Sequence, residues 1–248
     1  MGTIVFFRCC KNRNYPKDVQ FIMASAPDAN ISSSTSLKYW NSISTTVDGM
    51  LGGYPEISRT DLKGSANFLA KLRREHPSSA QGSLRRGVDC GAGIGRVTAF
   101  FLSTVCEVID VVEPVEKFAN EAKGAKMAGK GVVGNVYVTG LESWGPEERY
   151  DVIWNQWCLG HLTDKQLVDY LQRCKKAVTA DGWIIVKENM STNANGEDVF
   201  DDLDSSVTRS NEKFKVLFKE AGVRCMKTEP QRGFPKGLYP VHFYALKP

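Results

Sequence analysis

The chain has 248 residues, of which 42% are hydrophobic and 24% charged, so it has enough apolar material for one sizeable core. Its formal net charge is +4, but 32 basic side chains are scattered among 28 acidic ones, and no basic stripe indicates nucleic-acid binding. No apolar run approaches the roughly 20 residues that cross a bilayer. Seven cysteines without a CxxC pair or a Cys/His cluster indicate neither a disulfide framework nor a metal site. We expect reduced thiols and a cytosolic or nuclear protein.

The first 35 residues carry few signs of regular structure. Arg8 follows the short apolar opening, whereas a secretory signal would carry its positive charges first. A second methionine, Met23, precedes the serine-rich residues 32–36. We therefore expect residues 1–35 to form a disordered arm, with Met23 as a candidate native start.

Residues 36–85 have a mainly helical pattern. A short helix is expected around residues 37–40, before a glycine-rich turn at residues 47–54. Leu62, Phe68 and Leu72 recur at helical spacing within residues 57–75. This part of the chain is predicted to form an N-terminal helical cap.

From residue 86 the pattern alternates between strands and helices. The expected strands are residues 87–90, 105–113, 136–139, 150–157 and 183–188, and the expected helices are residues 97–103, 117–127 and 163–178. Alternation of this kind predicts βαβ units and a parallel sheet.

The C-terminal part departs from this alternation. A helix at residues 211–221 is followed by two strands, at residues 223–229 and 241–246, with only a loop between them. Such a pair is typical of antiparallel strands that close a sheet edge. We therefore predict one α/β domain over residues 36–248, with a Rossmann-like core at residues 86–248 and a seven-stranded, mostly parallel sheet.

The sharpest local signal is a glycine turn after the first strand, at Gly91, Gly93 and Gly95. Glycines let the backbone turn tightly and approach a ligand where a Cβ would collide, and the helix that follows offers free N–H groups. An ordinary strand-to-helix turn is also glycine-rich. Here, however, Glu113 ends the next strand about twenty residues on, the position from which a carboxylate binds ribose hydroxyls. The context favours ligand binding over a plain turn.

The spacing Gly-x-Gly-x-Gly, preceded by Asp89, resembles motif I of the Class I methyltransferases rather than a dinucleotide fingerprint. This resemblance implies a Rossmann-like Class I methyltransferase fold and S-adenosylmethionine as the cofactor, with S-adenosylhomocysteine as the product. In that family the turn faces the amino-acid part of the cofactor and the acid after the second strand holds the ribose. The acid here is Glu113 followed by Pro114, where an Asp is common.

Three further stretches, residues 46–54, 151–164 and 201–206, resemble the protein α-N-terminal methyltransferases. The resemblance implies methyl transfer to the α-amino group of proteins that begin X-Pro-Lys or X-Pro-Arg after removal of the initiator methionine, such as ribosomal proteins. Asn155 and Cys158 are less familiar residues within the second stretch.

Methylation of an α-amine needs a proton acceptor, because the amine has a pKa of about 7.7–8.0 and is largely protonated at pH 7. The resemblance gives this role to Asp204 and His161. It also implies two sets of binding residues. The cofactor set is Trp40, Gly91, Gly93, Arg96, Glu113, Pro114, Val115, Leu141, Glu142 and Gln156. The substrate set is Tyr39, Leu51, Gly52, Trp157, Asn189, Asp201, Ser206 and Tyr239, with Tyr39 and Trp40 at the outer wall of the cofactor site.

Simpler interpretations exist for several of these residues. His161 could cap the helix that opens near residue 163, and residues 201–204 could be a solvated acidic loop. Trp154 and Trp157 lie three apart on a strand and therefore face opposite sides, so one of them could be core. Competing functions are a small-molecule methyltransferase, an inactive cofactor-binding scaffold and, with least support, a nucleic-acid methyltransferase.

Overall fold

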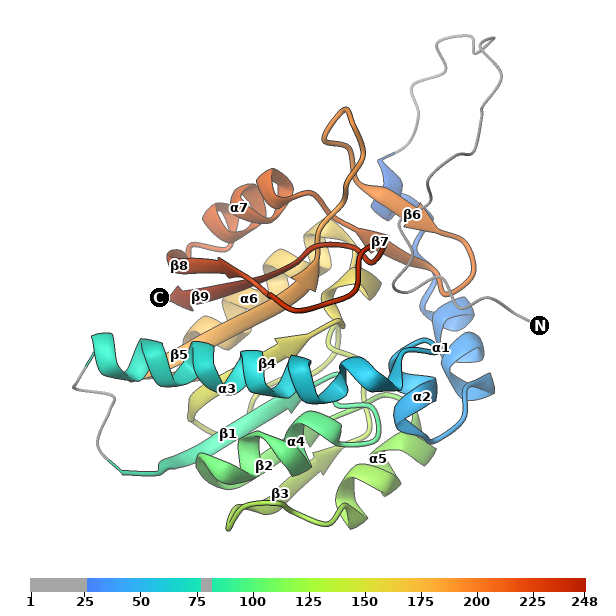
Figure 1. The fold of residues 1–248 in the computed structure, drawn as a ribbon. Helices are drawn as coiled ribbons and strands as arrows, with labels where there is room; N and C mark the ends of the chain where they lie inside the picture. The colour runs from blue at the N-terminus through green and yellow to red at the C-terminus, as the bar shows by residue number, and fades with distance from the viewer. Residues whose placement is uncertain (1–25, 77–81) are drawn as a thin grey trace, which may run out of the picture.

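The computed structural model describes residues 26–76 and 82–248, and a seven-stranded sheet forms its middle layer (Figure 1). The strand order is β3-β2-β1-β4-β5-β9-β8. The first five strands in chain order are parallel: β1 (Leu84–Cys90), β2 (Cys106–Val112), β3 (Val132–Tyr137), β4 (Tyr150–Gln156) and β5 (Val178–Asn189). The order reverses between β1 and β4, and ligands of such sheets bind at the carboxyl ends of the strands beside this reversal.

The last two strands of the sheet are not placed in chain order. β9 (Val241–Lys247) lies between β5 and β8 (Arg224–Pro230) and is antiparallel to both. The predicted antiparallel pair is confirmed, and the strand at the sheet edge is β8. Asn189 at the end of β5 pairs with Val241 at the start of β9. The start of β9 therefore lies at the carboxyl end of β5.

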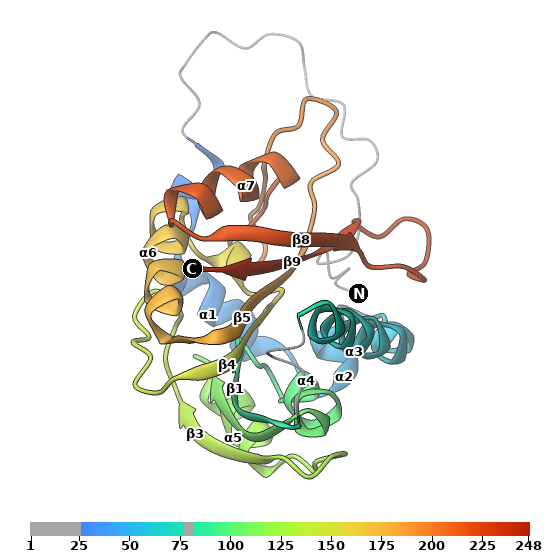
Figure 2. The ribbon, with the colours of Figure 1, turned by 90° about the vertical axis from the view of Figure 1, so that its left-hand side faces the viewer.

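Helices cover both faces of the sheet, as Figure 2 shows. One face packs against α6 (Asp164–Ala177) and α7 (Asn211–Glu220), and the other packs against α3 (Ser58–Glu75) and α4 (Arg96–Phe100). α5 (Glu116–Gly124) contacts β2 and β3. None of the described helices is both long and apolar enough to cross a membrane.

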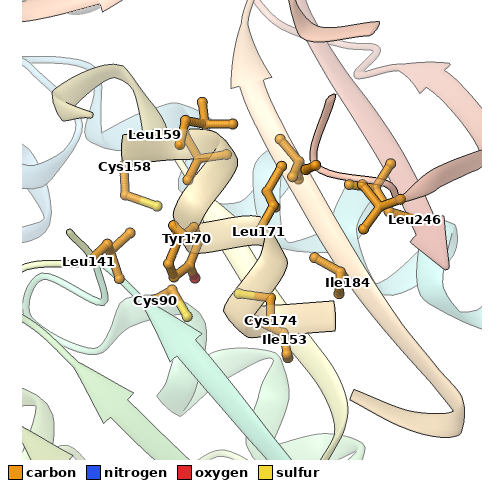
Figure 3. Close-up of a cluster of buried hydrophobic side chains, with 14 of the residues drawn as sticks. Cys90, Leu141, Ile153, Cys158, Leu159, Tyr170, Leu171, Cys174, Ile184 and Leu246 are labelled. Carbon is orange, nitrogen blue, oxygen red and sulfur yellow. The ribbon is translucent and has the colours of Figure 1, made fainter. Parts of the chain in front are cut away.

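The start of α6 shows how local sequence determines an element. Thr163 accepts a hydrogen bond from the backbone N–H of Gln166, whose side chain accepts one from the backbone of Thr163, so a capping box begins the helix. Apolar side chains at spacings of three and four then bury one face of the helix. Figure 3 shows Tyr170, Leu171 and Cys174 on this face, beside Cys90, Ile153 and Ile184 of the sheet.

Ordered structure begins earlier than the sequence predicts. Residues 1–25 of the expected disordered arm lie outside the described residues, but η1 (Pro27–Asn30) and the start of α1 (Ser33–Ser42) fall within the rest of it. The prediction of disorder is wrong for the serine-rich stretch, because Ser32 caps α1 and residues 33–36 form its first turn. The Ser32 N–H also donates to Oγ of Ser205, and Asp28 accepts a bond from the N–H of Asp164. These contacts fix the segment to the start of α6 and to Ser205, the residue after the predicted acid Asp204.

Short elements connect this N-terminal segment and the strands. They are α2 (Val47–Met50), η2 (Pro55–Ile57), η4 (Leu102–Thr104), η5 (Leu159–His161) and a hairpin formed by β6 (Val199–Asp201) and β7 (Ser206–Thr208). The hairpin was not predicted, because strands of three residues show too little alternation to be recognised. Arg209, fully buried after β7, donates to the carbonyl oxygens of Leu159 and Leu162 and so fixes the hairpin to η5.

Candidate active site

The turn between β1 and α4 passes through Gly91, Gly93 and Gly95, which all have positive φ angles. A Cβ on Gly91, where φ is +66°, would lie 2.4 Å from the Cβ of Cys158. A Cβ on Gly93 would lie 2.7 Å from Sδ of Met50. The turn therefore presents bare backbone at the carboxyl edge of the sheet, where a ligand can approach it closely.

Glu113 connects this turn to the end of β2. One carboxylate oxygen accepts a 2.8 Å hydrogen bond from the N–H of Gly93, and the other accepts a 2.8 Å bond from the N–H of Val115. Burial raises the pKa of Glu113 to about 7, although these two bonds oppose the rise. Each oxygen can accept a further bond, so the carboxylate is fixed in place with acceptor capacity left for hydroxyl groups.

A cavity opens above the ends of β1, β2 and β4. All ten residues of the predicted cofactor set line it: Trp40, Gly91, Gly93, Arg96, Glu113, Pro114, Val115, Leu141, Glu142 and Gln156. Leu37, Met50 and Phe118, which the sequence analysis did not single out, add apolar surface. The structure thus gathers residues that are up to 116 positions apart, from Trp40 to Gln156, around one space.

The groups around this cavity fit S-adenosylmethionine. The guanidinium of Arg96 is a partner for a carboxylate, and Glu113 is a partner for sugar hydroxyls. Leu37, Phe118 and Leu141 provide apolar surface for a flat base. Within the described ranges, no group of three or more His, Cys, Asp or Glu side chains is placed to hold a metal ion.

His161 lies in the wall of the cavity and connects η5 to α1. Its Nε2 accepts a 3.2 Å hydrogen bond from Nε1–H of Trp40, and its Nδ1 lies 3.0 Å from Oγ of Ser36. Burial lowers the pKa of His161 to about 4, so the ring is neutral at pH 7. The helix-cap interpretation is wrong, because Thr163 caps α6.

Asp204 lies in the connection between β6 and β7. It is only 2% exposed, so the alternative of a solvated acidic loop does not apply to it. Oδ1 accepts a 2.7 Å hydrogen bond from Oγ of Ser206, while the buried Oδ2 has no hydrogen-bond partner among the described residues. Burial, with a smaller contribution from the charge of Asp201, raises the pKa of Asp204 to about 7. Asp204 thus has one oxygen fixed and the other ready to accept a proton.

Tyr39 lies within electrostatic range of Asp204 and Asp201 and does not line the cofactor cavity. Its pKa is raised to about 12, first by burial and then by the charges of Asp204 and Asp201. Its neighbour Trp40 does line the cavity, so the two adjacent aromatic side chains of α1 serve different parts of the site. Of the predicted outer wall, the structure therefore assigns only Trp40 to the cofactor side.

An apolar cluster lies next to the cavity. Leu51 and Ile57 are buried at its centre, and Trp157 packs against them together with Val47, Tyr54, Phe234 and Leu238. Trp154, by contrast, is fully buried in the core below. Because Trp157 also lines the cavity, the apolar cluster and the cofactor space share a wall.

Backbone strain marks the same region. Trp157 and Ser205 are the two non-glycine residues with positive φ in the described part of the chain, at 55° and 56°. Such a conformation costs about 1–3 kcal/mol and is retained mainly where function requires it. One of these residues carries the ring of the apolar cluster, and the other follows Asp204.

Eight members of the predicted site lie outside the lining of the cavity: Tyr39, Leu51, Gly52, Asn189, Asp201, Asp204, Ser206 and Tyr239. Tyr39 lies on α1, and the other seven occupy the β6–β7 hairpin, the turn after α2 and the facing ends of β5 and β9. Asn189 ends β5, and Tyr239 precedes Pro240, whose carbonyl accepts a 2.7 Å bond from Met190. Sequence reasoning missed Ile57 in the apolar cluster and the buried charges of Asp61 and Lys187 beneath it.

Comparisons with known proteins agree with this geometry. The profile of a family described as AdoMet dependent proline di-methyltransferase matches residues 28–247. Alpha N-terminal protein methyltransferase 1 of Schizosaccharomyces pombe is 46% identical, over 87% of this chain and 95% of its own. N-terminal Xaa-Pro-Lys N-methyltransferase 1-A of Xenopus laevis is 41% identical, over 84% of this chain and 92% of its own.

A solved structure also superimposes well. It is a SAM-dependent methyltransferase of Leishmania major, 38% identical, with a TM-score of 0.77 over 86% of this chain and 82% of that chain. The sheet order, the glycine turn with Glu113 and these matches over most of the chain all agree. This chain belongs to the AdoMet-dependent proline di-methyltransferase family, and it has the Rossmann-like fold of the Class I methyltransferases.

Proposed function

We propose that this protein transfers methyl groups from S-adenosylmethionine to the α-amino group of proteins that begin X-Pro-Lys or X-Pro-Arg once the initiator methionine is removed. Ribosomal proteins with such termini fall within this class. The observation that carries the proposal is the buried carboxylate of Asp204, with one oxygen unpaired among the described residues, on the hairpin beside the cofactor cavity. The names of the relatives support the same acceptor.

Asp204 is the stronger of the two predicted proton acceptors. When bound, the cofactor supplies a methyl group on a sulfonium, which only a neutral amine can attack. The pKa of Asp204, about 7, lies within about one unit of the usual α-amine value, so proton transfer between them is nearly balanced. His161, with a pKa of about 4 and a hydrogen bond from Trp40, is a weaker base, and we assign it to positioning α1 against the cavity.

The apolar cluster suits the proline of the substrate. A proline ring within a peptide has no N–H donor to satisfy, and Trp157, Leu51 and Ile57 offer a buried apolar surface next to the cofactor cavity. Gly52 belongs to the same turn as Leu51. Asn189, with Tyr239 close by, provides polar groups for the first residues of the peptide backbone.

The acidic hairpin suits the basic third residue. Asp201 and Ser206 flank Asp204, and the charges of Asp201 and Asp204 reach Tyr39 of α1. A Lys or Arg side chain would meet a negative local field on a protein whose net charge is positive. This local contrast favours a basic peptide over a small-molecule acceptor.

The direct test is methyl transfer to a synthetic peptide that begins Ser-Pro-Lys, followed by mass spectrometry. We expect one to three methyl groups on the α-amine, located by fragmentation. The same peptide with an acetylated N-terminus and a Ser-Ala-Lys peptide serve as controls and should gain none or far fewer. Methylation of the acetylated peptide would show a side-chain acceptor instead, and failure with every X-Pro-Lys and X-Pro-Arg peptide would reject the proposal.

A further inference from the structure

A cluster of buried charges lies beneath the wall shared by the cofactor cavity and the apolar cluster. Asp61 of α3 and Lys187 of β5 are both 0% exposed. Nζ of Lys187 donates to Oδ1 of Asp61 and also bonds the carbonyl of Asp61 at 3.1 Å and Oγ of Ser65 at 3.0 Å. These three hydrogen bonds of Lys187 therefore all go to residues of α3.

The same carboxylate holds two residues of the cofactor cavity. Oδ2 of Asp61 lies 2.7 Å from Nη1 of Arg96, and Nε2 of Gln156 lies 3.0 Å from each oxygen of Asp61. Burial alone would raise the pKa of Asp61, but Lys187 and Arg96 outweigh it and hold the pKa below its usual value. Asp61 thus fixes the positions of Arg96 and Gln156 from outside the cavity.

Trp157 lies against both cations of this cluster. Nζ of Lys187 is 5.7 Å and Cζ of Arg96 is 5.9 Å from the centroid of its ring, within the range of cation–π attraction. The backbone N–H of Trp157 also donates a 3.1 Å bond to the carbonyl of Lys187. The ring that faces the proposed proline site is therefore held by the residues that Asp61 holds.

Two cations of this cluster share one carboxylate. Arg96 and Lys187 both pair directly with Asp61, and the charge of Arg96 also reaches the buried Asp89. Buried charges are tolerated where each is paired and hydrogen-bonded. Arg96 lines the cavity, so a carboxylate bound there would give it a further partner and fix it over the Trp157 ring.

We propose that Asp61 and Lys187 are positioning residues that couple the two ligand sites: they hold Arg96 toward the cofactor and Trp157 toward the peptide, so that each ligand tightens the binding of the other. This inference rests on the proposed function, because it takes an X-Pro-Lys peptide as the second ligand. Neither residue lines the cofactor cavity. Their effect reaches both ligands through Arg96, Gln156 and Trp157.

The test measures the dissociation constant of a Ser-Pro-Lys peptide with and without saturating S-adenosylhomocysteine, by titration calorimetry. In the wild type we expect the cofactor product to tighten peptide binding about tenfold, within the usual range of coupling between sites. In Lys187→Met and in Asp61→Asn the ratio of the two dissociation constants should fall to about one or two. If Asp61 and Lys187 only maintained the structure, the variants would bind each ligand more weakly but the ratio of the two dissociation constants would not change.

Lys71→Met is the matched control, because Lys71 is also on α3 but pairs with Glu229. It should retain the tenfold ratio. If Lys187→Met does not fold, Ser65→Ala removes a single bond to Lys187 and should reduce the ratio about two- to threefold. An unchanged ratio in the folded cluster variants, or a ratio of one in the wild type, would overturn the inference. Methylation of the peptide by the wild type in that case would leave the proposed function standing.

Discussion

Burial shifts the pKa values of two predicted site residues, Asp204 and His161, in opposite directions. Burial disfavours the charged form of either group, so it raises the pKa of Asp204 to about 7 and lowers the pKa of His161 to about 4. At neutral pH a large share of Asp204 is a carboxylate that can accept a proton, whereas His161 is a neutral ring. The same physical effect therefore suits Asp204 to its proposed role as the base and suits His161 to a proposed role as a hydrogen-bonding support.

Replacing Asp204 with Asn should reduce turnover about 10²- to 10⁴-fold, because the proton acceptor is lost while the shape is retained. Affinity for S-adenosylhomocysteine should stay close to that of the wild type, since Asp204 does not line the cofactor cavity. Steady-state rates and calorimetry measure the two effects. Asp202→Asn, at an exposed neighbouring position, is the control and should keep nearly full activity. Equal turnover in the two variants would remove Asp204 from the mechanism.

The same variant should be more stable than the wild type in alkaline solution. The folded protein holds the Asp204 proton up to about pH 7, whereas the unfolded chain loses it near pH 3.8. The stabilisation that this bound proton contributes is therefore fully present below pH 3.8 and is lost as the pH rises through about 7. Near pH 8 the neutral Asn should raise the free energy of unfolding by about 1–3 kcal/mol. Urea unfolding near pH 8 and near pH 4 checks this, and a gain of equal size at both pH values would contradict it.

At the scale of elements, the turn between β1 and α4 requires glycine at position 91 for two reasons: the backbone φ is positive, and Cys158 packs too closely to leave room for a Cβ. Gly91→Ala should both strain the backbone and push the new Cβ into Cys158, at a spacing of 2.4 Å. Gly196 has a similar φ of +72°, but a Cβ there would meet nothing within 4 Å. Gly196→Ala should therefore cost about 1 kcal/mol, and Gly91→Ala several times more, with weakened cofactor binding. Thermal unfolding and calorimetry would compare them, and equal losses would mean that conformation alone matters at Gly91.

The elements also show which parts of the structure could be predicted from the sequence. β1, β2, β4 and β5 and the glycine turn are encoded locally, by apolar runs and by residues with special backbone freedom. The β6–β7 hairpin was not predicted, and β3 starts four residues earlier than expected, at Val132 instead of 136, because it is an edge strand with exposed residues. Short or exposed strands carry little periodicity.

The buried pair of Asp61 and Lys187 was missed for another reason: its members are 126 residues apart, and only the fold brings them together. Each residue of the pair nevertheless had a recognisable position in the sequence pattern. Asp61 lies on the apolar stripe of its helix, four and seven residues before Ser65 and Phe68. Lys187 follows a run of buried apolar residues in a central strand. A charge at a core position of either element requires a buried partner.

At the scale of the whole molecule, the protein has a net charge of +4, yet the proposed peptide site is acidic. Attraction of a basic peptide is therefore local, and salt screens it over about 10 Å at 0.1 M. The value of kcat/KM for a Ser-Pro-Lys peptide should fall several-fold between about 0.05 M and about 0.5 M NaCl. Asp201→Asn should remove most of this dependence.

Asp169→Asn on α6 makes the same change in net charge away from the hairpin, and it should retain the salt dependence. Rates at four or five salt concentrations for the three proteins are sufficient to separate the two effects. If both variants lost the dependence to the same extent, the net charge rather than the hairpin would determine it.

The place of β9 has a consequence for the order in which the molecule can form. β8 is synthesised before β9, but its neighbour in the sheet is β9, and β9 in turn pairs with β5. While the chain emerges from a ribosome, the five parallel strands β1 to β5 can pair with their sheet neighbours as each becomes available. β8 must wait, because the residues that pair with it, 242–247, emerge after it. The start of β9 adjoins Asn189, so this late insertion also completes the proposed peptide side of the active site. We therefore expect nascent chains that end before residue 241 to have a formed cofactor half and an open peptide half.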